Sequence, residues 1–272
     1  MSEFNRRAAL RFGAGVAGAA ALGAVTRPIR AGADPTAPTM VTGTFISTAR
    51  GGIPTNWSIA RPPGQTQPLR PVIALHGKGS SAASVMAGGV EGGLAQAVAA
   101  GLPPFAVVAV DGGGGYWHAR ASGEDSGAMV LDELLPMLGE QGLDTSRVGF
   151  MGWSMGGYGA LLLGARLGPA RTAAICAVSP ALWFSSDASA PGAFDGPGDY
   201  AANSVWGLPA LASIPIRIDC GDSDPFYAAT KAFIAQLPNP PAGGFSPGGH
   251  DPAYWSSQLP AEIAWMAPLV TA

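Results

Sequence analysis

A serine flanked by glycines stands out at residues 152–156, where the chain reads Gly-Trp-Ser-Met-Gly. The stretch fits the pattern G-x-S-x-G, in which a serine occupies the sharp turn between a buried strand and a helix. Its neighbours supply that context, because the apolar run VGFMGW precedes Ser154 and the run MGGYGALLLG follows it. An ordinary Gly-rich turn is the alternative in a chain with 40 glycines. We favour a nucleophilic Ser154, with the Met155 amide donating to an oxyanion.

A serine hydroxyl is inert without a base, so a histidine is needed. The chain has three histidines, at positions 76, 118 and 250. Only His250 follows both the serine and the aspartates near residue 220. This gives the order nucleophile, acid, histidine that is found in enzymes whose serine occupies such a strand–turn–helix. We therefore expect His250 to be the base.

The acid is expected just after the apolar run IPIRID, where three aspartates compete. Asp219 still lies in the predicted strand and is expected to be structural. Asp222 and Asp224 lie in the turn CGDSDPF, at the carboxyl end of the sheet. We favour Asp224, because a loop just before the helix that starts at Pro225 can aim it at His250. Asp222 stays the alternative, and the residue that is not the acid can cap the helix.

A second oxyanion donor is expected from the loop after the strand VIALHG. The residues HGKGSS place Lys78 or Gly79 there, and we favour the amide of Lys78. These residues do not make a phosphate-binding loop, because Val72 stands where its first glycine should be and Gly79 replaces its serine or threonine.

The glycine-rich loop DGGGGYWHARASGEDSG follows another apolar run and is expected to border the mouth of the site. One interpretation makes it a substrate-binding wall, with Tyr116 and Trp117 against an acyl chain or sugar and Arg120 on a polar group. The other makes the loop structural, through an ion pair of Arg120 with Glu124 or Asp125. Both interpretations stay open.

Strands and helices alternate at short spacing along the chain. Continuous apolar runs, typical of buried parallel strands, lie at 70–77, 104–113, 146–153, 171–180 and 214–222. Helices are predicted at 91–101, 126–142, 154–168, 225–238 and 253–270. Two alternating runs at 41–48 and 55–62 predict antiparallel edge strands, and 242–251 a short strand and loop. This alternation predicts a doubly wound α/β sandwich with a mostly parallel sheet in one domain.

Residues 181–206 differ from the rest, because they are rich in glycine, proline and aromatic residues without a clear period. They predict an excursion from the core that can serve as a short lid. Tyr254 and Trp255, which closely follow His250, are instead expected to pack in the core.

The first 33 residues have the composition of an export signal. The pair Arg6 and Arg7 precedes an Ala/Gly-rich stretch that is too short to span a bilayer comfortably. Ala31–Ala33 then fits the small-residue cleavage rule. We expect a twin-arginine-type signal, with a frayed helix as the alternative, and a catalytic domain at 34–272 that is secreted or resides in the cell envelope.

Composition excludes several classes of function. The net charge is −3, there are only two lysines and the sequence shows no basic patch, so we do not expect nucleic acid as a partner. The scattered histidines and cysteines do not make a metal site, and we expect no cofactor. Cys176 and Cys220 lie in apolar runs, where we favour buried free thiols, although export would permit a disulfide.

Six motifs, LHGKGSS, DGGGGYWH, DELLP, GWSMGGYGALLLG, CGDSDPF and GGHDPAYW, together resemble those of α/β-hydrolase esterases. This group includes esterase D-type carboxylesterases and secreted mycolyltransferases, and the motifs span most of the chain after the predicted signal. The resemblance implies the α/β-hydrolase fold, the triad Ser154, Asp224 and His250, and oxyanion donors at Lys78 and Met155. The mycolyltransferases usually have a glutamate as the acid and a longer chain. The resemblance therefore carries over the catalytic apparatus but not their acyl-trehalose substrate.

These features predict an exported serine esterase that acts on a small-molecule, lipid or sugar ester through an acyl-enzyme on Ser154. An acyltransferase of the cell envelope, with a sugar hydroxyl in place of water, is the second hypothesis. An exported binding protein that keeps a hydrolase fold is the third. The acyl length, the alcohol part and the oligomeric state stay open.

Overall fold

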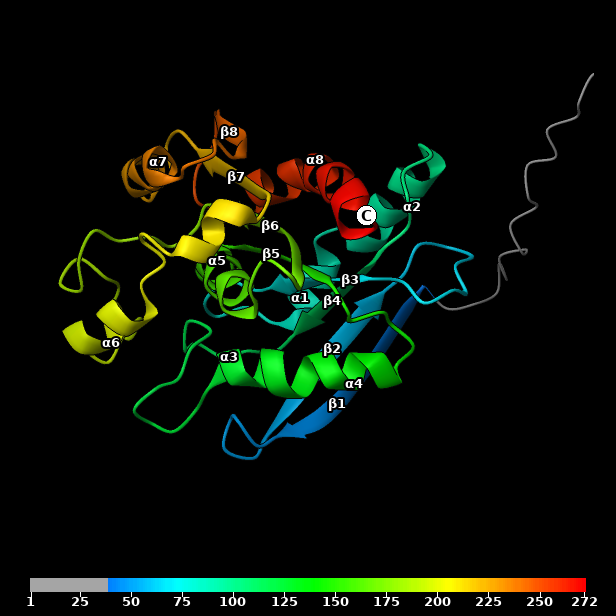
Figure 1. The fold of residues 1–272 in the computed structure, drawn as a ribbon, viewed down its shortest axis with the longest axis horizontal. Coiled ribbons are helices and arrows are strands. Elements are labelled where there is room, and N and C mark those ends of the chain that lie inside the picture. Colours follow the sequence, from blue (N-terminus) through cyan, green and yellow to red (C-terminus); the bar gives the residue numbers. More distant parts are fainter. Residues whose placement is uncertain (1–38) are drawn as a thin grey trace, which may run out of the picture. The chain divides into compact units, whose positions relative to one another are not determined.

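The structure is a computed structural model that describes residues 39–272 (Figure 1). The predicted export signal at residues 1–33 lies outside these described residues. Within them, no helix combines the length and the apolar character needed to cross a membrane.

An eight-stranded sheet has the order β1-β2-β4-β3-β5-β6-β7-β8. Its strands are β1 (Met40–Ser47), β2 (Ile53–Ala60), β3 (Pro71–Leu75), β4 (Ala106–Val110), β5 (Val148–Trp153), β6 (Thr172–Val178), β7 (Ile216–Gly221) and β8 (Ala242–Ser246). The pairs β1–β2 and β2–β4 are antiparallel, and all other pairs are parallel. The predicted mostly parallel sheet with an antiparallel edge is therefore confirmed.

Helices cover both faces of this sheet (Figure 1). They are α1 (Ala82–Ala87), α2 (Val90–Ala99), α3 (Ser126–Ala128), a π-helical turn (Met129–Leu134), α4 (Leu135–Glu140), α5 (Met155–Leu167), α6 (Pro197–Asn203), a 3₁₀ turn (Pro209–Ser213), α7 (Tyr227–Gln236) and α8 (Pro252–Val270). One apolar core joins the sheet to α1, α2 and α8, and a second joins it to α4, α5 and α7. Because helices cover both faces of the sheet, the central strands β3, β4 and β6 are buried along their whole length, and this is why their sequences are almost continuously apolar. The predicted α/β sandwich is therefore confirmed, with the sheet as the middle of three layers.

The helix predicted at 126–142 is present, but it is not a regular α-helix. A π-helical turn at Met129–Leu134 separates α3 from α4. Pro136 begins the next turn, and a proline has no N–H to donate to the carbonyl four residues earlier. Such a missing bond favours the wider turn seen just before it.

Candidate active site

Ser154 occupies the turn between β5 and α5, with the backbone angles φ = +55° and ψ = −122°. Such a conformation is strained for a residue with a side chain and persists only where its surroundings enforce it. The flanking glycines allow it, because a Cβ at Gly152 would meet the backbone of Gly156, and a Cβ at Gly156 would collide with the carbonyl of Leu75. The sequence therefore places the hydroxyl above the carboxyl end of the sheet.

Three side chains from different loops form a continuous chain of hydrogen bonds at this point. The Nε2 atom of His250 lies 2.9 Å from the Oγ atom of Ser154. Its Nδ1 atom lies 2.8 Å from an Oδ atom of Asp224. Because a carboxylate only accepts, this pattern assigns the proton to Nδ1 and leaves Nε2 free to accept from the serine hydroxyl. The structure thus brings together the three residues predicted to be the nucleophile, base and acid.

Asp224 is held in place by its other oxygen, which accepts from the Phe226 amide at 2.8 Å. Burial raises the pKa of its carboxyl group, but the hydrogen bonds from His250 and the Phe226 amide outweigh that effect and bring the pKa below its ordinary value. The rival residue Asp222 is exposed and bonds instead to Ser223 and the Gly248 amide. Only Asp224 is therefore positioned to orient His250.

One predicted oxyanion donor directly follows the serine, and the other belongs to a residue that lines the same pocket as the serine. Met155 is the first residue of α5, and Lys78 lies in the loop between β3 and α1. Neither backbone N–H donates to another group among residues 39–272, so both are available to a ligand. The start of α5 adds the positive end of its dipole. The Lys78 side chain takes no part in this arrangement, since its Nζ atom donates to the Pro191 carbonyl at 3.0 Å.

His76 supports this loop without touching Ser154. Its Nε2 atom accepts from the Gly112 amide at 2.9 Å, and its Nδ1 atom lies 2.8 Å from the Gly77 carbonyl. Burial lowers the pKa of the imidazole, so it stays neutral. It thereby joins the Lys78 loop to the glycine-rich loop after β4.

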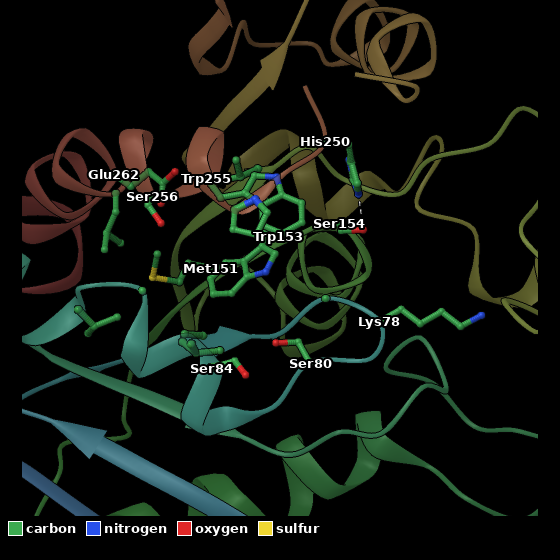
Figure 2. Close-up of a pocket in the computed structure, with 18 residues that line it drawn as sticks. Lys78, Ser80, Ser84, Met151, Trp153, Ser154, His250, Trp255, Ser256 and Glu262 are labelled. Carbon is green, nitrogen blue, oxygen red and sulfur yellow. Dashed lines mark hydrogen bonds between the residues drawn. The ribbon is translucent and has the colours of Figure 1, made fainter. Parts of the chain in front are cut away.

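A pocket of about 380 Å³ opens at Ser154 and His250 and lies against α1, α2 and α8 (Figure 2). Two indole rings stand in its wall, Trp153 and Trp255, which stack at 6.1 Å between ring centroids. Trp255 is half-buried: it packs against the core, as expected, but it also lines the pocket. Tyr254, its neighbour, is buried as expected.

The glycine-rich loop does not form the wall of this pocket. Trp117, expected to face substrate, has no exposed surface, and Tyr116 is also buried. The indole of Trp117 lies against Gly112 and Gly159, where any side chain would occupy the space of its ring. The prediction that Trp117 binds substrate is therefore wrong, because the ring fills the core beneath the site. Tyr116 is not among the residues that line the pocket either. Its link to the site is the Lys78 ammonium group, which lies 5.7 Å from the centre of the tyrosine ring.

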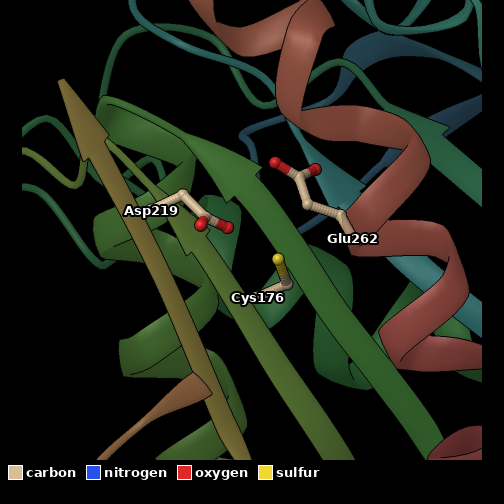
Figure 3. Close-up of side chains that lie close together, drawn as sticks. All are labelled: Cys176, Asp219 and Glu262. Atoms are coloured by element: carbon tan, nitrogen blue, oxygen red, sulfur yellow. The ribbon is translucent and has the colours of Figure 1, made fainter. Parts of the chain in front are cut away.

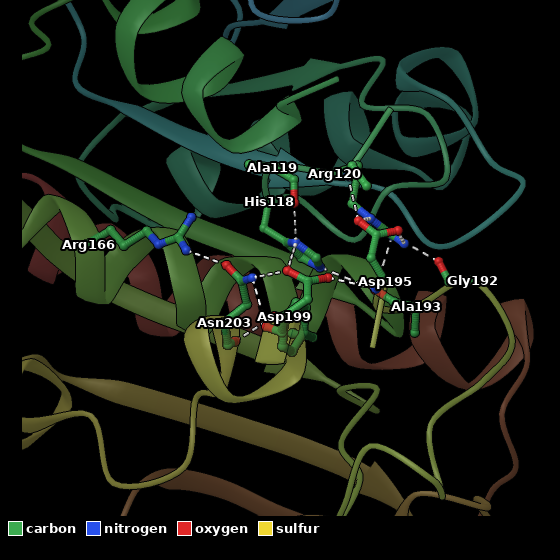
Figure 4. Close-up of polar contacts among 11 residues, drawn as sticks. His118, Ala119, Arg120, Arg166, Gly192, Ala193, Asp195, Asp199 and Asn203 are labelled. Atoms are coloured by element: carbon green, nitrogen blue, oxygen red, sulfur yellow. Dashed lines mark hydrogen bonds and ion pairs between the residues drawn. The ribbon is translucent and has the colours of Figure 1, made fainter. Parts of the chain in front are cut away.

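Arg120 pairs with neither Glu124 nor Asp125, and it does not reach the pocket. Its guanidinium binds both carboxylate oxygens of Asp195, at 2.8 and 3.2 Å, and the carbonyls of Gly192 and Ala193 (Figure 4). The role predicted for Arg120 in substrate binding is thus corrected. It fastens the glycine-rich loop to the excursion at 181–206.

The excursion at 181–206 is further secured from within. It contains α6, and Asp199 of that helix accepts from the Asp195 amide at 2.8 Å and from the Asn203 side chain. His118, fully buried, stacks on Phe194 at 5.3 Å. In the described part of the chain, no residue of this excursion lines the pocket at Ser154.

Glu262 on α8 was not anticipated from the sequence, and it lines the pocket away from the triad. Its side chain is only 2% exposed. One ligand atom each of Glu262, Asp219 and Cys176 lie within 4.8 Å of one another (Figure 3). Burial, and secondarily the charge of Asp219, raise the pKa of Glu262 to about 8, against an opposing effect of Arg217. The carboxyl group is therefore mostly protonated at neutral pH.

The other two members of this group have ordinary explanations. Both oxygens of Asp219 accept from Arg217, at 2.6 and 3.0 Å, so its charge is matched by that guanidinium. Cys176 and Cys220 are both free and buried, which confirms the favoured expectation for the two thiols.

The free energy of unfolding of the parent is expected to fall as the pH rises, because Glu262 is buried. Glu262→Gln should abolish this fall, since glutamine does not ionise. The folded protein keeps a proton on Glu262 up to about pH 8, whereas the unfolded chain releases it near 4.5. Ionisation thus favours the unfolded state, and the parent's free energy of unfolding falls between those pH values. The full effect is at most about 5 kcal/mol, at 1.36 kcal/mol per pKa unit.

Urea unfolding at pH 5 and pH 9 measures this difference. The gain of Glu262→Gln over the parent should be larger at pH 9, while Glu140→Gln on the exposed end of α4 should show no such change. Equal gains at both pH values would show that Glu262 is ionised throughout.

Comparison with known proteins places this geometry in a known fold. No known protein-family model matches the sequence, and no curated protein matches it. Among solved structures, the chain is similar to a ferulic acid esterase, at 22% identity over 85% of this chain and 98% of that one, with a TM-score of 0.73. It is also similar to an S-formylglutathione hydrolase from Staphylococcus aureus (20% identity, 84% and 98% covered, TM-score 0.69) and to MPT51 of Mycobacterium tuberculosis (17%, 84% and 99%, 0.66). These similarities show that the chain has the α/β-hydrolase fold.

Proposed function

We propose that the protein is an exported serine carboxylic-ester hydrolase that works through an acyl-enzyme on Ser154. The observation that carries the proposal is the unbroken hydrogen-bonded chain from Ser154 through His250 to Asp224, at the mouth of a pocket. The names of structurally similar proteins support the same class of reaction, since they include a ferulic acid esterase and an S-formylglutathione hydrolase. Export rests on the composition of residues 1–33.

In the first half of the reaction, the Oγ atom of Ser154 attacks the ester carbonyl carbon while Nε2 of His250 takes the hydroxyl proton. The carbonyl oxygen becomes an oxyanion, and the amides of Met155 and Lys78 donate to it. When the intermediate collapses, the bond to the alcohol oxygen breaks and His250 returns the proton to that oxygen. The alcohol leaves, and the acyl group stays on Ser154.

In the second half, water repeats the attack on the acyl-enzyme. His250 takes a proton from the water, and the new oxyanion accepts hydrogen bonds from the same two amides. The bond between the acyl carbon and Oγ then breaks, and His250 returns the proton to the serine. The Asp224 carboxylate accepts from Nδ1 throughout, which fixes the imidazole and stabilises its positive charge. A sugar hydroxyl in place of this water would give the acyltransferase reaction on the same residues.

The test is to assay the protein on short p-nitrophenyl esters and to trap the intermediate. We expect hydrolysis, and a fluorophosphonate probe should label the peptide that contains Ser154 in mass spectrometry. Folded Ser154→Ala should lose both. Hydrolysis by Ser154→Ala at the parent rate would overturn the proposal, and acylated sugar formed from an added acceptor at the expense of free acid would favour transfer instead.

A further inference from the structure

The pocket at Ser154 follows one face of α8. Its lining residues on this helix lie at positions i, i+3, i+4, i+7 and i+10, which share one side of a helix: Pro252, Trp255, Ser256, Leu259 and Glu262. At a rise of 1.5 Å per residue, Pro252 and Glu262 are separated by about 15 Å along the helix axis. Figure 2 shows Ser154 and His250 at one end, Glu262 at the other, and the two indoles between them. The pocket is thus an elongated cavity with Glu262 far from the reacting atoms.

The walls between these two ends are mainly apolar. Side chains from three directions contribute, namely Val85 of α1, Met151 and Trp153 of β5, and Trp255 and Leu259 of α8. Such walls suit an extended apolar arm of a substrate, and a few well-placed polar groups usually set the specificity of a pocket of this kind.

Glu262 is the exception in this apolar cavity. Its Oε1 atom is buried, and no hydrogen bond to its carboxyl group is found in the part of the chain that the structure describes. A buried polar group without a partner destabilises the protein, because the group has lost its hydrogen bonds to water and gained none in return. The nearest titratable groups, Cys176 on β6 and Asp219 on β7, do not relieve it, because Asp219 is bound to Arg217 and the Cys176 thiol is only a weak donor. The carboxyl group is therefore free to bind a ligand.

The surroundings select the chemistry of that ligand. An anionic tip would be a buried charge with no cation to pair with among the described residues that line this end of the cavity, and a cationic tip would require Glu262 to ionise in an apolar wall; both are costly. A hydroxyl group has one O–H donor and can also accept, as a protonated carboxyl group does, so the two can pair in either direction. It is neutral, and it can satisfy the carboxyl group without a new buried charge.

We propose that Glu262 is a specificity-determining residue, which binds a hydroxyl group at the far end of the apolar substrate arm that fills the pocket. The natural substrate class is then an ester with an elongated, hydroxyl-tipped arm. This inference rests on the proposed hydrolase function of Ser154, and it adds to that function a preference which the triad alone cannot create.

The experiment compares esters in pairs that differ only in a terminal hydroxyl, with arm lengths in steps. One series carries the arm on the acyl side and the other on the alcohol side, because either could occupy the pocket. The measured quantity is the ratio of kcat/KM for the hydroxylated ester to that for its partner, at pH 7. A general loss of activity cancels in this ratio.

In the parent we expect a ratio of about 10 at one arm length, since a neutral hydrogen bond contributes up to about 1.5 kcal/mol. Glu262→Leu should bring the ratio to 1 or below. Glu262→Gln keeps a donor and an acceptor in nearly the same shape, so its kcat/KM ratio should stay within about threefold of the parent ratio. This variant keeps the inference testable even if the leucine variant does not fold.

Two results would overturn the inference. One is a parent ratio near 1 at every length in both series, and the other is a preference that survives in folded Glu262→Leu. A larger gain from an amino tip than from a hydroxyl tip would also count against it, because that ligand needs an ionised Glu262. Failure of the proposed function looks different, since hydrolysis would then not depend on Ser154 for any ester.

Discussion

Replacing Asp224 by asparagine is expected to lower kcat for ester hydrolysis by about 10⁴, with little change in folding. The Oδ atom that now accepts from Nδ1 of His250 at 2.8 Å can become an amide NH₂ group, which donates. The imidazole would then carry its proton on Nε2, facing Ser154, and could not accept the serine proton. The orienting bond from the Phe226 amide can still be made by the amide oxygen, so the loop should keep its shape.

The matched control is Asp222→Asn, two residues away on the same turn. Asp222 is exposed and bonds to Ser223 and the Gly248 amide rather than to His250, so we expect kcat of the Asp222→Asn variant to stay within about twofold of the parent. Steady-state assays on one ester give kcat for both variants, and circular dichroism confirms that both are folded. Comparable losses in the two variants would mean that the turn matters only as a whole, and that Asp224 is not the acid.

The triad could be predicted because its signals are local in the sequence. The G-x-S-x-G turn between a strand and a helix fixes the backbone of Ser154, and the chain order of the architecture selects His250 among three histidines. The choice between Asp222 and Asp224 depended on which residue of one turn points inward. Only the structure shows that Asp224 is buried against His250 while Asp222 faces solvent.

The surroundings of the site could not be predicted in the same way, because they depend on contacts between distant segments. Arg120 has two acidic residues close by in sequence, yet its partner is Asp195, 75 residues away. Trp117 looks like a loop aromatic, but Gly159 on α5 leaves the space into which its ring packs. Glu262 did leave a signal, as a lone acidic residue in the apolar run QLPAEIAWMAPLV. An acidic residue at a position that the apolar spacing assigns to the buried face of a helix is unusual, because glutamate is almost never fully buried unless it is paired.

Gly156→Ala is expected to destabilise the fold by about 3 kcal/mol or more, the upper end for overpacking, even though alanine is the better helix former. The added Cβ would be directed into the Leu75 carbonyl and the His76 carbonyl, which are main-chain atoms. Leu75 ends β3, a strand hydrogen-bonded on both sides, so it cannot move away without breaking the sheet. Overpacking against a rigid backbone belongs to the most damaging class of substitutions.

The same substitution at Gly92 separates this clash from any general effect of alanine. Gly92 lies in α2, is exposed, and has open space where its Cβ would be, so Gly92→Ala should stabilise the protein by about 0.5–1 kcal/mol. Chemical denaturation of both variants gives the two free energies of unfolding, and opposite signs are expected. If Gly156→Ala unfolded at the parent's denaturant midpoint and kept its hydrolytic rate, the close approach of β3 to the start of α5 would not be what holds Ser154 in its strained conformation. The oxyanion donor that the same turn supplies, the Met155 amide, would then also need another source of rigidity.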